Sequence, residues 1–92
     1  MYMAERPVVW DDANRKHLGL DHPEREINLD EITQAMTDPT REEARHPNRT
    51  DVWVTKGRTA AGRLLYVAWV EIPQGRYPVH AHGSGGTDDD SK

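Results

Sequence analysis

The stretch that decides the fold is residues 56–71, KGRTAAGRLLYVAWVE. The small residues at 59–62, TAAG, predict a turn, because glycine adopts backbone angles that tight turns require. The strongly apolar run over 63–72 predicts a strand, and DVWVTKGR before the turn predicts its partner. The sequence therefore predicts a β-hairpin, with Arg58 and Arg63 on either side of its turn.

Helices are predicted before this hairpin. The aspartate pair at 11–12 can cap a short helix that runs to about Leu18. Asn28, followed by Glu31 three residues later, is typical of a capping box that begins a second helix. That helix is expected to end before Pro39, because the residue before a proline avoids helical angles.

Three further strands are predicted around the hairpin. Residues 6–10 suit a short first strand, and residues 40–50 suit an edge strand followed by a turn. The last strand, RYPVHAH at 76–82, contains Pro78, which favours a sheet edge. We therefore predict an α+β fold, with two N-terminal helices packed on one face of an antiparallel sheet of three to five strands.

The central strand is apolar on both faces. Period-two counting places Tyr66 on one face and Trp69 on the other. With only two short helices available, one sheet face is expected to stay uncovered by this chain, and an uncovered aromatic face is typical of a protein interface. The predicted interface residues are Trp53, Tyr66 and Trp69.

Length and composition limit the classes of protein. Ninety-two residues suit one small domain, predicted over 1–82, followed by a disordered acidic, glycine-rich tail at 83–92. The net charge is −4, unlike that of a typical nucleic-acid binder, and the absence of cysteine excludes disulfides and a thiolate nucleophile. No apolar run approaches about 18 residues and no signal-peptide pattern opens the chain, so we expect a cytoplasmic protein without direct membrane contact.

Histidines and arginines supply the groups that RNA cleavage requires. A base must activate the 2′-hydroxyl, cations must stabilise the charged transition state, and an acid must protonate the leaving oxygen. His80 and His82 are two residues apart on a strand and so project from one face, while His17 ends the first helix. Arg58 and Arg63 could both face one phosphate if the hairpin is tight.

Each of these groups also has a simpler interpretation without a catalytic role. In that interpretation the two arginines are solvated residues beside a turn, the histidine pair is an exposed polar strand end, and His17 packs half-buried beside Trp10. A metal site is chemically possible but lacks helical ligand spacing; its candidate ligands are His17, Asp21, His22, His80 and His82. Neither a metal nor a cofactor is expected.

The order of these motifs resembles the BrnT family of small toxins from bacterial type II toxin–antitoxin pairs. The matching stretches are VVWDDANRKHLGLDH, EITQAMTDP, KGRTAAGRLLYVAWVE and YPVHAH, within residues 8–82. The matching positions are Trp10, Asp11, Asn14, His17, Asp38, Pro39, Gly57, Thr59, Gly62, Arg63 and Leu65. Two features depart from the family pattern: His80-Ala81-His82 replaces a Thr-Ala-Arg-like step, and the acidic tail replaces a C-terminal helix.

The resemblance implies a RelE-like fold and an endoribonuclease that inhibits translation without a metal, neutralised by a DNA-binding antitoxin. The predicted catalytic residues are Arg58, Arg63, His17 and His82, and the predicted RNA-binding residues are Lys56, Arg76 and His80. The alternative hypothesis is a non-catalytic module on the same scaffold, borne by a phage or mobile element, that binds a host protein or a second copy of itself. The departures and the negative charge favour this alternative.

Overall fold

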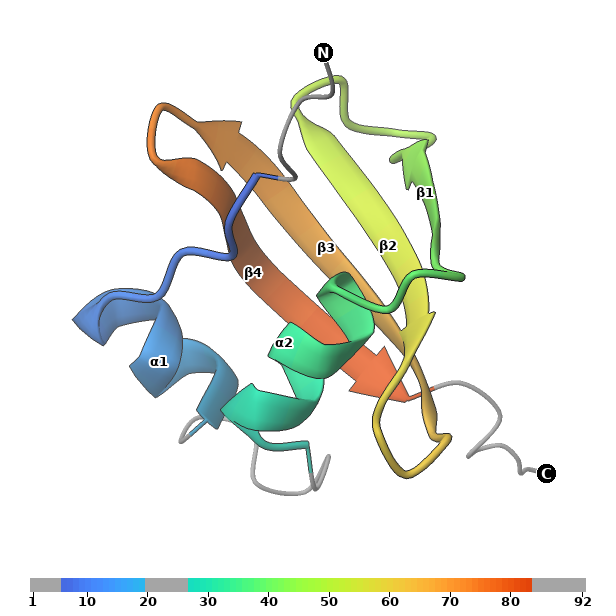
Figure 1. Cartoon of the computed structure of the whole chain (residues 1–92). Helices are drawn as coiled ribbons and strands as arrows, with labels where there is room; N and C mark the ends of the chain where they lie inside the picture. Colours follow the sequence, from blue (N-terminus) through green and yellow to red (C-terminus); the bar gives the residue numbers. More distant parts are fainter. Residues whose placement is uncertain (1–5, 20–26, 84–92) are drawn as a thin grey trace, which may run out of the picture.

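The computed structural model describes residues 6–19 and 27–83 (Figure 1). In chain order its elements are α1 (Asp12–Gly19), α2 (Leu29–Met36), β1 (Glu42–Arg45), β2 (Val52–Arg58), β3 (Leu64–Ile72) and β4 (Gly75–Gly83). The strands form one antiparallel sheet in the order β1-β2-β3-β4, and both helices lie on the same side of it. The predicted α+β fold is confirmed.

The segment predicted as a first strand, residues 6–10, forms only a single parallel bridge, between Val8 and Arg76. The Val9 amide donates to the Arg76 carbonyl at 2.8 Å, and the Arg76 amide donates to the Pro7 carbonyl at 2.8 Å. Pro7 has no amide hydrogen with which to continue a ladder. The segment therefore runs along the start of β4 without becoming a strand of its own.

The second helix begins at the predicted cap. The Asn28 side chain accepts a hydrogen bond from the Glu31 amide at 2.8 Å, and the Glu31 carboxylate accepts one from the Asn28 amide at 3.0 Å. This reciprocal pair satisfies amides that the first helical turn leaves without partners. The buried side chains of α2 are those of Ile32, Ala35 and Met36, which form one stripe toward the sheet.

β3 is an inner strand of the sheet, paired with β2 and β4. The hairpin turn before it closes where the Thr59 amide donates to the Arg63 carbonyl at 2.8 Å, and Gly62 has a φ of 88° that favours glycine. β4 lies at the sheet edge, as Pro78 predicts, and its register shifts at this proline. Gly83, predicted to begin the tail, is the last residue of β4, and residues 84–92 lie outside the described part of the chain.

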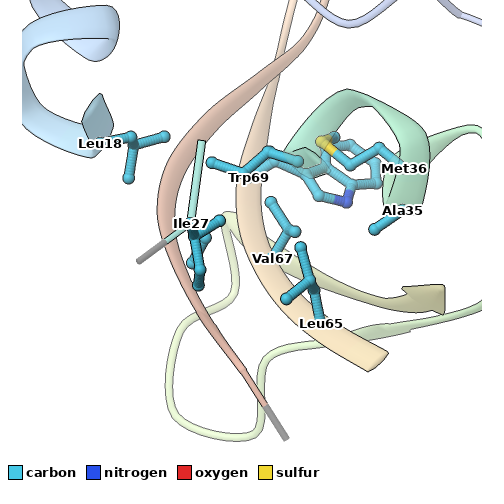
Figure 2. Packing of buried hydrophobic residues seen from close by; sticks show 9 residues of the cluster. Leu18, Ile27, Ala35, Met36, Leu65, Val67 and Trp69 are labelled. Atoms are coloured by element: carbon cyan, nitrogen blue, oxygen red, sulfur yellow. The ribbon is translucent and has the colours of Figure 1, made fainter. Parts of the chain in front are cut away.

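The hydrophobic core lies between the helices and one face of the sheet, which we call the inner face. Leu65, Val67 and Trp69 of β3 point into it, and Figure 2 shows the Trp69 ring close to Met36 of α2. Burial of each large apolar side chain contributes about 1.5–3 kcal/mol. Gly57 lets α2 pack closely on β2, because a Cβ at this position would collide with the Ala35 carbonyl oxygen.

A buried ionic network fixes the start of β4. Arg76 is 3% exposed, and its guanidinium donates to the Met36 carbonyl at 2.9 Å, to the Arg6 carbonyl at 2.9 Å and to the Glu43 carboxylate at 3.0 Å. Glu43 also accepts from Arg41 at 2.9 Å and from the Thr55 hydroxyl at 2.8 Å. The network joins the N-terminal segment, the end of α2, β1 and β4 at one buried cation.

The Glu43 carboxylate makes the stability of the fold depend on pH. Burial raises its pKa, but the bonds from Arg41 and Thr55 and the charges of Arg41 and Arg76 outweigh burial, so the pKa lies below its ordinary value of 4.5. A depressed pKa stabilises the fold above pH 4.5, and this stabilisation is lost as the pH falls through the folded-state value. We expect the free energy of unfolding of wild type to fall more steeply than that of Glu43→Gln below about pH 5.

Urea titrations of both proteins from pH 6 to pH 3 measure this difference. Asp11 and Asp38, whose pKa values are also lowered, titrate in the same acidic range and are present in both proteins. The comparison therefore isolates Glu43. A stability difference between the two proteins that stays constant over this pH range would contradict the expectation.

Candidate functional site

The N-terminal motif residues attach α1 to the sheet. Asn14 is buried; its side-chain oxygen accepts from the Asp11 amide at 2.8 Å, and its Nδ2 donates to the Val9 and Pro78 carbonyls at 3.0 and 3.2 Å. The Tyr77 hydroxyl donates to the Asp11 carboxylate at 2.9 Å. Hydrogen bonds from the Asn14 amide and from Tyr77 hold the pKa of Asp11 below its ordinary value. These groups position a helix.

The Asp-Pro motif joins α2 to the hairpin in a similar way. The Asp38 carboxylate accepts from the Thr40 and Arg58 amides, both at 2.9 Å, and the Gln34 side chain accepts from the Ala60 amide at 2.9 Å. The hydrogen bond from the Thr40 amide, and after it the one from the Arg58 amide, lower the pKa of Asp38 most strongly. The ionised carboxylate thus holds the end of β2 against the end of α2.

Arg58 and Arg63 lie on opposite faces of the sheet. Arg58 pairs with Leu64 across the hairpin, whereas Arg63 lies opposite Thr59. Paired residues share a face and successive residues alternate, so Arg63 is on the inner face and Arg58 on the opposite one, which we call the outer face. On the inner face, Nη1 of Arg63 lies 3.7 Å from the Glu31 carboxylate. The two arginines therefore do not meet at one phosphate.

The outer face carries a row of paired side chains that crosses all four strands. The register places Glu42, Lys56, Tyr66 and His82 in this row. The Tyr66 and His82 rings stack with centroids 5.4 Å apart at 12°, and the His80 ring lies 5.7 Å from that of His82. The predicted site residues that share this face are Lys56, Arg58, Tyr66, His80 and His82.

Two predicted site residues prove to be structural. Trp69 is 6% exposed and packs in the core (Figure 2), so its predicted place in a protein interface is wrong. Arg76 is buried in the network with Glu43, so its predicted contact with RNA is also wrong. Trp53 lies on the inner face, half-buried and stacked on Trp69 at 5.9 Å, with the Arg45 guanidinium 4.8 Å from its ring centre. The predicted aromatic trio is therefore divided between the two faces.

His17 does not join the outer face. It is exposed in the last turn of α1, and α1 lies on the helix side of the sheet (Figure 1). Across residues 6–19 and 27–83, no group of three or more histidine, aspartate or glutamate side chains is arranged to hold a metal ion. Asp21 and His22, considered as ligands from the sequence, lie outside the described residues.

The outer face has a second feature that the sequence did not predict. A hollow of ≈ 360 Å³ lies beside His80; its lining residues are His46, Arg49, Val52, Ala68, Val70, Val79 and His80. The pairing of Val52 with Val70 could have been anticipated from period-two counting. The approach of the turn after β1 to this face could not, because the turn contains no regular pattern.

Comparison with known proteins leaves the site to be interpreted from its chemistry alone. No protein-family model, curated protein or solved structure matches the chain. Within the described residues, no helix has the length and apolar character needed to cross a membrane.

Proposed function

We propose that this chain is a BrnT-like toxin that binds and cuts single-stranded RNA on the outer face of its sheet. The observation that carries the proposal is the stacked Tyr66–His82 ring pair, with His80 beside it and two cations, Lys56 and Arg58, on the same face. An aromatic surface beside cations is the usual means of holding single-stranded nucleic acid. Nζ of Lys56 lies 3.9 Å from the Glu42 carboxylate, and because an exposed pair adds little stability, Lys56 can turn to a phosphate. Phosphate binding depends on the field near the cations and is therefore compatible with a net charge of −4.

The side chains of this face lie within reach of one nucleotide. Neighbouring strands are about 4.8 Å apart, and residues two apart on a strand are separated by about 6.8 Å. The backbone positions of Lys56 and His82, one strand to either side of Tyr66, are therefore about 10 Å apart, and Arg58 lies one step further along β2. The Arg58 guanidinium donates to the Gly62 carbonyl at 3.0 Å, which holds it near the turn.

The proposed reaction uses the two imidazoles as base and acid. One takes the proton of a 2′-hydroxyl while the 2′-oxygen bonds to phosphorus, and the other gives its proton to the 5′-oxygen as the P–O bond breaks. The products are a 2′,3′-cyclic phosphate and a 5′-hydroxyl. Lys56 and Arg58 stabilise the negative charge on the phosphoryl oxygens, and Tyr66 stacks on a base.

The RNA-binding prediction compares the two faces of the hairpin. We expect Tyr66→Ala to weaken binding of a short fluorescent single-stranded RNA about 5- to 150-fold, since one stacked base contributes about 1–3 kcal/mol. Arg58→Ala should weaken binding and reduce its dependence on salt, because a phosphate contact is lost. Arg63→Ala, on the inner face, and Arg15→Ala, on α1, should leave the affinity close to that of wild type. Fluorescence anisotropy at several salt concentrations measures all four.

A result in which Arg63→Ala weakens binding as much as Arg58→Ala would contradict the assignment of the outer face. The same variants can be expressed in bacteria, where RNA cleavage in the cytoplasm predicts an arrest of translation that Tyr66→Ala relieves. An antitoxin co-expressed with the chain should relieve it as well, in keeping with the family that the sequence resembles.

A second candidate function is binding of a protein through the same face. Val54, Ala68 and Val70 give its centre an apolar character, and apolar patches are typical of protein interfaces. If this were the whole function, the chain would not bind or cut RNA. Growth arrest on expression would then persist in Arg58→Ala and be abolished by Val54→Glu, which places a charge in the apolar centre. Lys56, Arg58 and the ring stack favour RNA as the first proposal.

A further inference from the structure

We infer that the hollow beside His80 is a second nucleotide-binding subsite, which receives the base next to the one stacked on Tyr66. This inference rests on the proposed RNA-binding function and specifies its ligand as at least two consecutive, unpaired nucleotides. The two places are adjacent, since Ala68, in the floor of the hollow, follows Tyr66 by two residues on the same face of β3.

The floor of the hollow suits the flat face of a base. It consists of small and branched apolar side chains, those of Val52, Ala68, Val70 and Val79. Its volume of ≈ 360 Å³ is at the lower end of the range of ligand pockets, about 300–1,000 Å³. A single planar ring system can therefore lie against the valines.

The rim carries groups that can bind the phosphates of a single strand. Arg49 and His46 enter from the turn between β1 and β2, and His80 enters from β4 on the opposite side. Nδ1 of His46 accepts from the Asn48 amide at 3.0 Å, which directs the other ring nitrogen away from that amide. The Arg49 guanidinium lies 3.7 Å from the Asp51 carboxylate, and both side chains are well exposed. Because an exposed pair adds little stability, Arg49 can turn to a phosphate.

The spacing indicates an extended single strand as the ligand. His80 is part of the rim, and its ring lies 5.7 Å from that of His82. A strand whose first base stacks on Tyr66 would therefore carry its next base past His80 to the valine floor. Both bases must expose their faces to the protein. Unpaired bases can do this on the surface of a sheet, whereas the bases of a duplex are stacked on one another.

The experiment compares a mononucleotide with a dinucleotide that cannot be cut. The probes are deoxyadenosine 5′-monophosphate and the deoxydinucleotide dApdA, each titrated into the full chain by calorimetry. We expect dApdA to bind at least about tenfold more tightly, because a second stacked base is added. Ala68→Leu, which fills the floor, and Arg49→Ala, which removes a rim cation, should each remove most of this advantage while the affinity for the mononucleotide is kept.

The controls separate this inference from the function on which it rests. Arg15→Ala, on α1, should change neither affinity. If dApdA and the mononucleotide bind equally, or if Arg49→Ala leaves the dinucleotide advantage intact, the subsite is wrong while the Tyr66 site stands. If neither probe binds and Tyr66→Ala has no effect on RNA, both proposals fail and a protein ligand takes their place. Arg49 is exposed, so its variant is expected to fold even if Ala68→Leu does not.

Discussion

His82→Ala is expected to slow RNA cleavage about 10²- to 10⁴-fold, the usual contribution of a positioned general acid or base. Because the His82 ring also stacks on Tyr66, the variant should bind RNA less tightly as well. The rate must therefore be measured at saturating RNA, with product followed by gel. His80→Ala should reduce the rate by a similar factor, and each variant should lose one limb of a bell-shaped pH profile, since each removes one of two ionising groups.

The control for this prediction is His17→Ala. The sequence makes His17 as plausible a catalytic group as His82, but α1 places it on the helix side of the sheet. Its variant should cut RNA at the wild-type rate and with the wild-type pH profile. If His17→Ala were the inactive variant and His82→Ala the active one, the outer face would not be the catalytic surface.

The fold could be predicted because local patterns determine it. The Asn28–Glu31 capping box, the Asp-Pro end of α2 and the positive φ of Gly62 each act within a few residues. The two faces of β3 follow from strict alternation, which places Leu65 and Trp69 on one face, and the structure shows that this face is the one buried in the core. The same alternation argues against an exposed Trp69, because Leu65 and Val67 share its face.

The sequence could not predict which face each arginine occupies, because it does not specify the register of the hairpin strands. Arg58 pairs with Leu64, so Arg63 lies one position nearer the turn and on the other face. A slip of one residue in this register would have placed both arginines on one face, because the side-chain period is two. The sequence TAAG at 59–62 is compatible with either loop length.

The burial of Arg76 depended on residues distant in sequence. Its acceptors are the carboxylate of Glu43, 33 residues earlier, and the carbonyls of Met36 and Arg6. An arginine in a polar final strand is usually solvated, and only this convergence makes burial of its charge favourable. Two residues of the BrnT-like motifs also depend on residues distant in sequence. Asn14 donates to the Pro78 carbonyl and Asp38 accepts from the Arg58 amide, and the short motifs around them do not include these partners.

Arg76→Met is expected to lower the free energy of unfolding by about 3 kcal/mol, within the range for breaking a buried ion pair. Methionine keeps much of the apolar stem beside Trp69 but removes every donor to Met36, Arg6 and Glu43. The loss is at the lower end of that range because the Glu43 side chain is 27% exposed and keeps bonds from Arg41 and Thr55. Small domains have only about 5–15 kcal/mol of stability in total, so the change is large.

Urea denaturation followed by tryptophan fluorescence measures this effect, since Trp69 lies 5.7 Å from the Arg76 guanidinium. Arg15→Met, on the exposed side of α1, is the matched control and should change stability by less than about 0.5 kcal/mol. Arg76→Lys separates charge from geometry: an ammonium keeps the charge but lacks the planar fork that serves acceptors on several sides, so it should recover only part of the loss. Full recovery by lysine would show that charge alone matters, and an Arg76→Met protein as stable as wild type would contradict a structural role for the network.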